Sequence, residues 1–315
     1  MINKNILITS AGVATAINVI SALRNSKKIK CKITATDISI DSPGLFLADN
    51  YYLTPQVTDE FFLSELIKII KQESIDFIFP LHSSEIHFFS KNKLALQNVG
   101  VGIVIPEIDV IQKCENKDQF QLFLKNNNFS YPTTFESKTQ INNFPVFIKL
   151  KKGSSSAGAH KINNRSELNF YLKGQKGKYI IQEYIDWEEI TIDCYVNSNQ
   201  FLIGFVPRYR IKVKDGKSVV AKTMFNLNLL NETARLLNAL KYKGACNLQV
   251  FYKEGNIKII ELNPRLSAGG LPLTIEAGIN IPELMINDYY NTISNDLLEY
   301  NQDLKMYRYL TEIFK

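Results

Sequence analysis

The sequence of 315 residues is poor in several features that would mark a special class of protein. It has only four cysteines, Cys31, Cys114, Cys194 and Cys246, which lie far apart and form no C-x-x-C pair. Such spacing argues against a metal knuckle or a redox motif, and it is typical of free thiols in a reducing compartment. We therefore expect a cytoplasmic protein.

Long apolar runs and blocks of charge are also missing. No stretch approaches the roughly 20 uninterrupted apolar residues of a membrane helix. Polar residues interrupt the first apolar run, and no convincing cleavage site follows it, which argues against a signal peptide. The net charge of +6 is spread along the chain and suits an anionic ligand such as a nucleotide. Basic and aromatic residues do not interleave, so we expect neither a nucleic-acid nor a membrane partner.

The composition is that of a globular protein, with 45% hydrophobic and 22% charged residues. In the first hundred residues, apolar runs at 5–12, 31–38 and 75–81 alternate with helical patterns at 13–26 and 61–74. This alternation predicts parallel strands joined by crossover helices, in a small doubly wound domain over 1–105. No G-x-G-x-x-G fingerprint of dinucleotide binding occurs there.

The ligand crevice of this first domain is expected where its strands end, near 10–12, Asp37 and 81–85. His82 and Glu85 are candidates for substrate contact in that crevice, although capping or core roles also suit them. After residue 105 the pattern changes. A helix within 106–132 precedes strands at 144–150, 178–185 and 188–213, a helix at 231–240 and a β-hairpin at 244–265. The whole chain is therefore predicted to be α/β followed by α+β.

The end of the predicted hairpin, "IKIIELNPRLSAGG", carries polar residues at alternate positions of an apolar strand. Glu261 and Asn263 face the same way, as does Arg265, which suits a phosphoryl group or a carboxylate. A three-residue hairpin loop puts Gln249 opposite Glu261, whereas a four-residue loop turns it away. Carboxylate and amide oxygens suit Mg²⁺. The alternative is a hairpin with a solvated polar face.

A second group of candidates surrounds the loop that follows Lys149. Small residues let backbone N–H groups approach phosphate oxygens, and the lysine supplies positive charge; an ordinary turn beside an exposed lysine is the alternative. The loop residues concerned are Gly153, Ser154, Ser155, Ser156 and Gly158. Arg208 and Arg210 share one face of a strand, where a solvated basic strand is again the alternative.

Five motifs in order give the chain a resemblance to a known family. The pattern Q-(x)11-E-x-N-P-R of Gln249 to Arg265 resembles the metal-binding hairpin of ATP-grasp ligases, especially the branch of carbamoyl-phosphate synthase large subunits. The other matching stretches are "ENKDQFQLFLKNNNFSYPTTF", "FPVFIKLKKGSSSAGAHKI", "YIIQEYIDWEEITIDCYV" and "VPRYRIKV". Trp187 stands where the family often has glycine. Ser83 and Ser84 stand where relatives often carry an acid.

The resemblance implies an ATP-grasp fold with a doubly wound N-terminal domain (1–105), an ATP-grasp domain (106–290) and a C-terminal tail (291–315) packed on it. A lid subdomain covers about 133–183. It further implies ATP and Mg²⁺, or Mn²⁺, as cofactors. The nucleotide residues would be Lys117, Lys149 with its loop, Glu183, Tyr184, Ile185, Glu189 and Arg208. The metal residues would be Glu261, Asn263 and Gln249, and the catalytic residues Arg265, Arg210 and Lys149.

The activity that the resemblance implies is a carboxylate–amine ligase that works through an acylphosphate and releases ADP and phosphate. A bicarbonate-using carboxylase or carbamoyl-phosphate-synthase-like enzyme is the alternative of the same class, and a non-catalytic nucleotide-binding subunit is the alternative of another class. The partners would be a small carboxylate and a small amine. Dimers are common in that family, so the resemblance also allows a homodimer.

Overall fold

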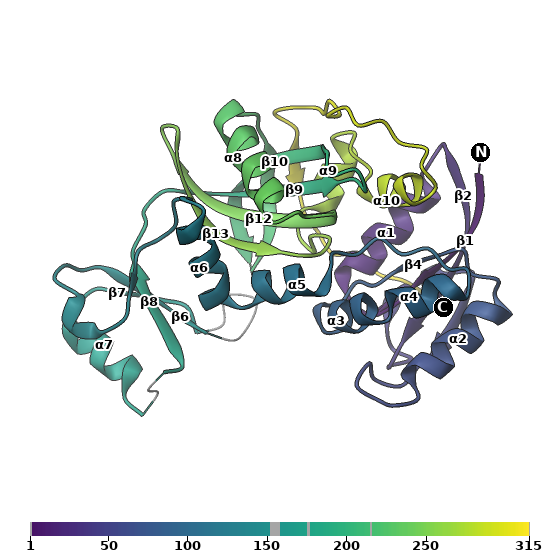
Figure 1. The fold of residues 1–315 in the computed structure, drawn as a ribbon, viewed down its shortest axis with the longest axis horizontal. Coiled ribbons are helices and arrows are strands. Elements are labelled where there is room, and N and C mark those ends of the chain that lie inside the picture. Colours follow the sequence, from purple (N-terminus) through teal and green to yellow (C-terminus); the bar gives the residue numbers. More distant parts are fainter. Residues whose placement is uncertain (1, 152–157, 175–176, 215, 315) are drawn as a thin grey trace.

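The computed structural model of the protein describes residues 2–151, 158–174, 177–214 and 216–314. These residues form three β-sheets with helices around them (Figure 1). A parallel four-stranded sheet lies at one end of the molecule, a small antiparallel sheet lies at the other, and a six-stranded sheet lies between them. Within these residues, no helix is long and apolar enough to cross a membrane.

The first sheet is parallel throughout and has the strand order β3-β2-β1-β4. Its strands are β1 (Ile2–Ile8), β2 (Ile29–Asp37), β3 (Asn50–Leu53) and β4 (Phe77–Phe79). The other elements are α1 (Ala14–Arg24), η1 (Pro43–Leu47), α2 (Phe62–Gln72), α3 (Ser83–Lys91) and α4 (Lys93–Asn98). This is the doubly wound domain that the sequence predicts. Its strand order reverses between β1 and β4, the kind of position at which such domains bind ligands.

The small antiparallel sheet has the order β5-β8-β6-β7 and is covered by one helix, α7. Its elements are β5 (Thr134–Phe135), η2 (Lys138–Gln140), β6 (Val146–Leu150), β7 (His160–Ile162), α7 (Arg165–Leu172) and β8 (Tyr179–Glu183). Two helices, α5 (Ile108–Glu115) and α6 (Lys117–Asn126), precede it in the chain. The sheet has a small core of its own, which includes Ile148, Ile162 and Leu168.

The central sheet is antiparallel and has the order β13-β12-β9-β10-β11-β14. Its strands are β9 (Glu188–Val196), β10 (Leu202–Lys214), β11 (Lys217–Thr223), β12 (Gly244–Lys253), β13 (Asn256–Asn263) and β14 (Lys305–Tyr307). The helices of this part are α8 (Leu227–Ala239), α9 (Leu271–Glu276) and α10 (Ile281–Tyr289). The C-terminal segment thus adds β14 to the edge of the sheet beside β11.

One hydrophobic core joins the first domain to the central sheet. Helix α1 packs against α10, and Ile20 of α1 belongs to the same buried cluster as Leu284 and Ile286 of α10. Tyr195 of β9 and Leu266, which follows β13, belong to this cluster as well. Because dense apolar packing resists deformation, this core fixes the strand ends of the first domain relative to the end of β13.

Candidate functional site

The hairpin of β12 and β13 carries the oxygen-bearing side chains of the site. Lys253 pairs with Asn256, so the loop consists of only Glu254 and Gly255, whose φ angles are 49° and 87°. Positive φ at both loop residues is typical of the type I′ turn that suits two-residue hairpins. The expectation that a three-residue loop sets this register is therefore wrong.

A β-bulge supplies the extra residue that the loop lacks. The pairing skips Ile260, and beyond it Gln249 stands opposite Glu261. A bulge of this kind shifts the register by one residue. It also explains why Ile259 and Leu262, three positions apart on a strand, are both buried in the core. The pairing that the metal hypothesis requires is thus present, although its cause differs from the expected one.

Glu261 and Asn263 are close enough to act together. Nδ2 of Asn263 donates a hydrogen bond of 3.1 Å to Oε1 of Glu261, and both side chains are half-buried. A half-turn of the amide would direct its Oδ1 to the same place, because an asparagine side chain carries a donor at one end and an acceptor at the other. With Gln249 across the strand pair, the three oxygen donors fit a hard divalent cation.

Two lysines approach these oxygens from β6 and from the start of α6. Lys149 on β6 is half-buried, and burial lowers its ammonium pKa, while the nearby Glu261 opposes this shift and Lys117 adds to it. Lys117 donates from Nζ to the carbonyl oxygen of Leu150, 2.9 Å away. It begins α6 because the side chain of Asn116 accepts hydrogen bonds from the following N–H groups. Two cations and one carboxylate therefore converge where β6 ends.

Arg265 connects this place to the first domain. Its Nε donates to Oγ of Ser83, 2.9 Å away, at the first residue of α3. Its Nη1 donates to the carbonyl oxygen of Leu266 at 3.2 Å. Burial lowers the pKa of the guanidinium, and Glu261 opposes the shift. The arginine thus lies between the oxygens of β13 and the strand ends of the parallel sheet.

Arg208 has a different environment from that of Arg265. It is 2% exposed and lies against Asp193, which is 1% exposed; Nη1 and Oδ2 are 2.8 Å apart. The same carboxylate accepts hydrogen bonds from Thr274 Oγ1 at 2.6 Å, Asn247 Nδ2 at 2.6 Å and Ser267 Oγ at 3.1 Å. We call these five residues the Asp193 cluster. It ties β9, β10 and β12 to the loop that follows Arg265.

Arg210, predicted as a catalytic residue, and Glu189, predicted as a nucleotide residue, form an ion pair with each other. Nη2 of Arg210 also donates to the carbonyl oxygen of Gly216 at 2.9 Å. Glu189 lies near the start of β9, and Arg210 lies within β10 next to the last pair of the two strands, Tyr209 with Ile190. The two predicted ligand contacts are thus adjacent and balance each other's charge.

Glu183 is the last residue of β8. Burial would raise its pKa, but an ion pair with Lys258 of β13 and a hydrogen bond of 2.8 Å from the backbone N–H of Thr133 lower it. The next residue, Tyr184, has Lys161 above its ring at 4.2 Å. Ile185 follows it and is half-buried. The lysine partner of Glu183 was not foreseen from the sequence, because Lys258 is one of many lysines on apolar strands.

The predicted phosphate loop is covered only in part by the structure. Gly153, Ser154, Ser155 and Ser156 lie outside the described residues. Gly158 is described and has φ of +69°, in the left-handed region that glycine favours. A Cβ atom at this position would lie 2.9 Å from the Leu150 side chain, so glycine is required there for two reasons.

A crevice of about 400 Å³ lies at the strand ends of the first domain, where the sequence predicts it. Ser10 and Gly12 after β1, Asp37 at the end of β2, and His82 and Glu85 after β4 are among its lining residues. Ser84 lines it too, so the crevice reaches the immediate neighbour of Ser83, the partner of Arg265. The crevice of the first domain therefore lies next to the candidate site at the end of β13.

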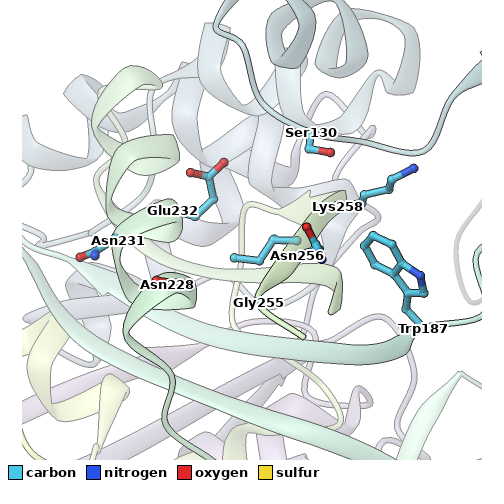
Figure 2. Close-up of a pocket in the computed structure, with 9 residues that line it drawn as sticks. Ser130, Trp187, Asn228, Asn231, Glu232, Gly255, Asn256 and Lys258 are labelled. Atoms are coloured by element: carbon cyan, nitrogen blue, oxygen red, sulfur yellow. The ribbon is translucent and has the colours of Figure 1, made fainter. Parts of the chain in front are cut away.

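A second pocket, of about 500 Å³, lies between α8 and the tip of the β12–β13 hairpin and was not predicted (Figure 2). Trp187 and Lys258 stand on one side of it, and Asn231 and Glu232 of α8 stand on the other (Figure 2). It is open and lined by polar side chains, several of them exposed. Only the tertiary fold brings α8 beside the hairpin tip, so no sequence signal could have located it.

Comparisons with known proteins match two parts of this chain to known families. Residues 6–104 match the family described as "PylC-like, N-terminal domain", and residues 175–312 match "ATP-grasp in the biosynthetic pathway with Ter operon". The chain is 26% identical over 313 residues to a formate-dependent phosphoribosylglycinamide formyltransferase of Prochlorococcus marinus, which covers 92% of this chain and 77% of that protein.

A second relative is the carbamoyl phosphate synthase large chain of Methanothermobacter thermautotrophicus, 26% identical over 250 residues. That match covers 70% of this chain but only 23% of the relative, so the chain spans about a quarter of its length. Among solved structures, biotin carboxylase from Campylobacter jejuni superposes with a TM-score of 0.73 at 16% identity. That alignment covers 95% of this chain and 74% of the carboxylase.

Proposed function

We propose that the chain is an ATP-grasp enzyme with a PylC-like N-terminal domain, and that it joins a small carboxylate to a small amine with hydrolysis of ATP to ADP and phosphate. The observation that most supports this reaction is the convergence of Glu261 and Asn263 of β13 with Lys149 of β6. Oxygen donors for a cation lie there beside a half-buried ammonium group. Phosphoryl transfer needs such positioned charge and no nucleophilic side chain.

We assign ATP and Mg²⁺, or Mn²⁺, to this site. Glu261 and Asn263, with Gln249 opposite, would hold the cation, which when bound supplies positive charge to the phosphates. Lys117 and Lys149 would contact phosphate oxygens. The remaining nucleotide residues of the proposal are Gly153, Ser154, Ser155, Ser156, Gly158, Glu183, Tyr184, Ile185, Glu189 and Arg208. For Arg208 the proposed part is indirect, because its guanidinium already contacts Asp193.

The reaction would proceed in two steps. A carboxylate oxygen of the first substrate attacks the γ-phosphorus of ATP, and the bond to ADP breaks, which leaves an acylphosphate. The amine nitrogen then attacks the acyl carbon, phosphate departs, and the nitrogen loses a proton to give the amide. Lys149 and Arg210 would offset the charge that develops on the phosphoryl oxygens. Arg265 would orient the carboxylate through paired N–H donors.

The test is release of ADP and phosphate from Mg-ATP across a grid of carboxylates and amines, with bicarbonate among the acids. Bicarbonate-dependent turnover would point to the carboxylase-like alternative. Glu261→Gln is the blank, and Glu254→Gln in the exposed hairpin turn is its matched control. We expect release that requires one acid and one amine, and that falls at least about 100-fold in the blank alone. Formation of AMP would contradict the acylphosphate route. ATP binding without turnover on a broad grid would favour a non-catalytic subunit.

A further inference from the structure

We propose that the crevice of the first domain holds the amine substrate, and that this substrate is a positively charged amine without a phosphate group. The inference rests on the proposed function, because it names the class of the second substrate. It starts from the position of the crevice. The cavity lies beside the point where the strand order reverses between β1 and β4, and it is lined by residues that follow β1, β2 and β4.

The crevice lies next to the proposed site of acyl transfer. His82 and Ser84 line it, and Ser83 between them accepts the hydrogen bond from Arg265. Arg265 follows Asn263 by two positions, so the same residue adjoins the cation site and the crevice wall. An amine held in the crevice could therefore present its nitrogen beside a carboxylate that Arg265 orients. The shared core of α1 and α10 keeps the two parts at a fixed distance.

The charge of the crevice opposes a phosphate. Strand ends of this kind often bind anions, because the N–H groups at helix starts point into the crevice. Here carboxylates of the chain itself occupy the place that an external anion would take. Oδ2 of Asp37 accepts the N–H of Gly12 at 2.7 Å, just before α1, and Glu85 lies in the first turn of α3. None of the described lining residues is a lysine or an arginine.

Glu85 supports the same inference. The residue is 6% exposed, and Thr9 Oγ1 donates a hydrogen bond of 2.7 Å to its carboxyl group. Burial raises the pKa of this carboxyl group, and the bond from Thr9 opposes the shift. A buried carboxyl group is costly to ionise alone, and an ammonium group in the crevice would stabilise its charged form. Hydroxyl groups of Ser10, Thr54 and Thr58 supply further acceptors on the wall.

The binding test needs neither ATP nor an acid. The full chain is titrated with 1,4-diaminobutane and butylamine, which differ in one positive charge, and with ethanolamine and phosphoethanolamine, which differ in one phosphate, by saturation-transfer NMR. We expect the diamine to bind at least about tenfold more tightly than butylamine, and phosphoethanolamine more weakly than ethanolamine. Tighter binding of the phosphorylated member would overturn the inference.

Two variants locate the binding. Asp37→Asn removes one negative charge and retains an acceptor for Gly12, and Thr58→Lys adds a cation at an exposed lining position. Either change should weaken diamine binding about tenfold or more. Asp41→Asn, an exposed carboxylate a few residues away, is the matched control and should have no effect. If Thr58→Lys folds and binds the diamine as the parent does, the crevice is not the binding site.

Hydroxylamine separates this inference from the proposed function. This small nucleophile traps an acylphosphate as a hydroxamate and does not require the crevice. Asp37→Asn should therefore form hydroxamate at the parental rate while its KM for the amine rises. If none of the acids gives hydroxamate while diamine binding is retained, the ligase activity is refuted and the crevice inference is left intact. Amide formation with unchanged amine KM in both variants would refute the crevice inference alone.

Discussion

Arg208 and Asp193 form a buried ion pair in which Nη1 lies 2.8 Å from Oδ2, with side chains 3% and 2% exposed. The pair joins β10 to β9, and through Ser267 and Thr274 it holds the loop that follows Arg265. This loop borders the proposed site of acyl transfer. Because this pair makes several contacts to the loop, we expect it to stabilise the fold. We also expect it to keep the two steps of the proposed reaction coupled.

Asp193→Ala should lower the free energy of unfolding by about 3–5 kcal/mol, because it leaves the Arg208 guanidinium buried without a counter-ion. The measurement is urea unfolding. The control is Asp303→Ala, which breaks the exposed ion pair with Lys222 (2.6 Å) and should cost less than about 1 kcal/mol. Equal losses of unfolding free energy in the two variants would contradict the stabilising role assigned to the Asp193 cluster. The double variant Asp193→Ala/Arg208→Met should recover part of the loss.

Gly270→Ala should be far more harmful than the same change one residue earlier. A Cβ atom on Gly270 would lie 1.8 Å from Nη2 of Arg208, whereas one on Gly269 would lie 3.3 Å from the nearest atom, the backbone nitrogen of Ser218. The φ of Gly270 is −109°, so the penalty is steric and not conformational. We expect Gly270→Ala to lower the free energy of unfolding by about 1–3 kcal/mol or more, measured by thermal or urea unfolding. A neutral Gly270→Ala variant would show that Arg208 can move freely.

Lys258→Met should change how stability depends on pH through Glu183. The folded-state pKa of Glu183 is lowered, so its contribution is present above its ordinary pKa of about 4.5 and is lost as pH falls through the folded value. Without Lys258 the variant should be less stable than the parent by about 1 kcal/mol at pH 7, and the two should converge as pH falls through the lowered folded-state pKa of Glu183. Lys253→Met, an exposed lysine on the same hairpin, is the control. A constant difference across this range would contradict the assigned pair.

Lys149→Met should reduce kcat/KM for ADP release by about 100-fold to 1000-fold, because a preorganised cation is removed from the phosphoryl group. Lys151→Met is the matched control, since Lys151 is exposed and pairs with Asp118 at 3.3 Å. The burial that lowers the pKa of Lys149 also means that its removal should not destabilise the fold. A similar fall of kcat/KM in both variants would indicate an effect of positive charge in this region in general, and not a specific contact of Lys149.

The sequence predicted most of the elements, because local periodicity reflects which faces are buried. Ala16, Val19, Ile20 and Leu23 predicted the buried face of α1, and all four are buried. The crevice was also predictable, since the carboxyl ends of parallel strands meet at one edge of a sheet. The hairpin loop was not, because a bulge at Ile260 and a shorter turn give the same pairing of Gln249 with Glu261.

The sequence by itself determined which residues carry oxygen and charge on one face of a strand, because side-chain direction alternates along β-structure. The tertiary structure alone decided which of them meet. Arg265 contacts Ser83 across 182 positions of the chain, and Arg208 lies against Asp193 in a buried cluster. Such contacts follow from how the first domain and the central sheet pack around a shared core, and that packing depends on the whole set of buried side chains and not on any local pattern.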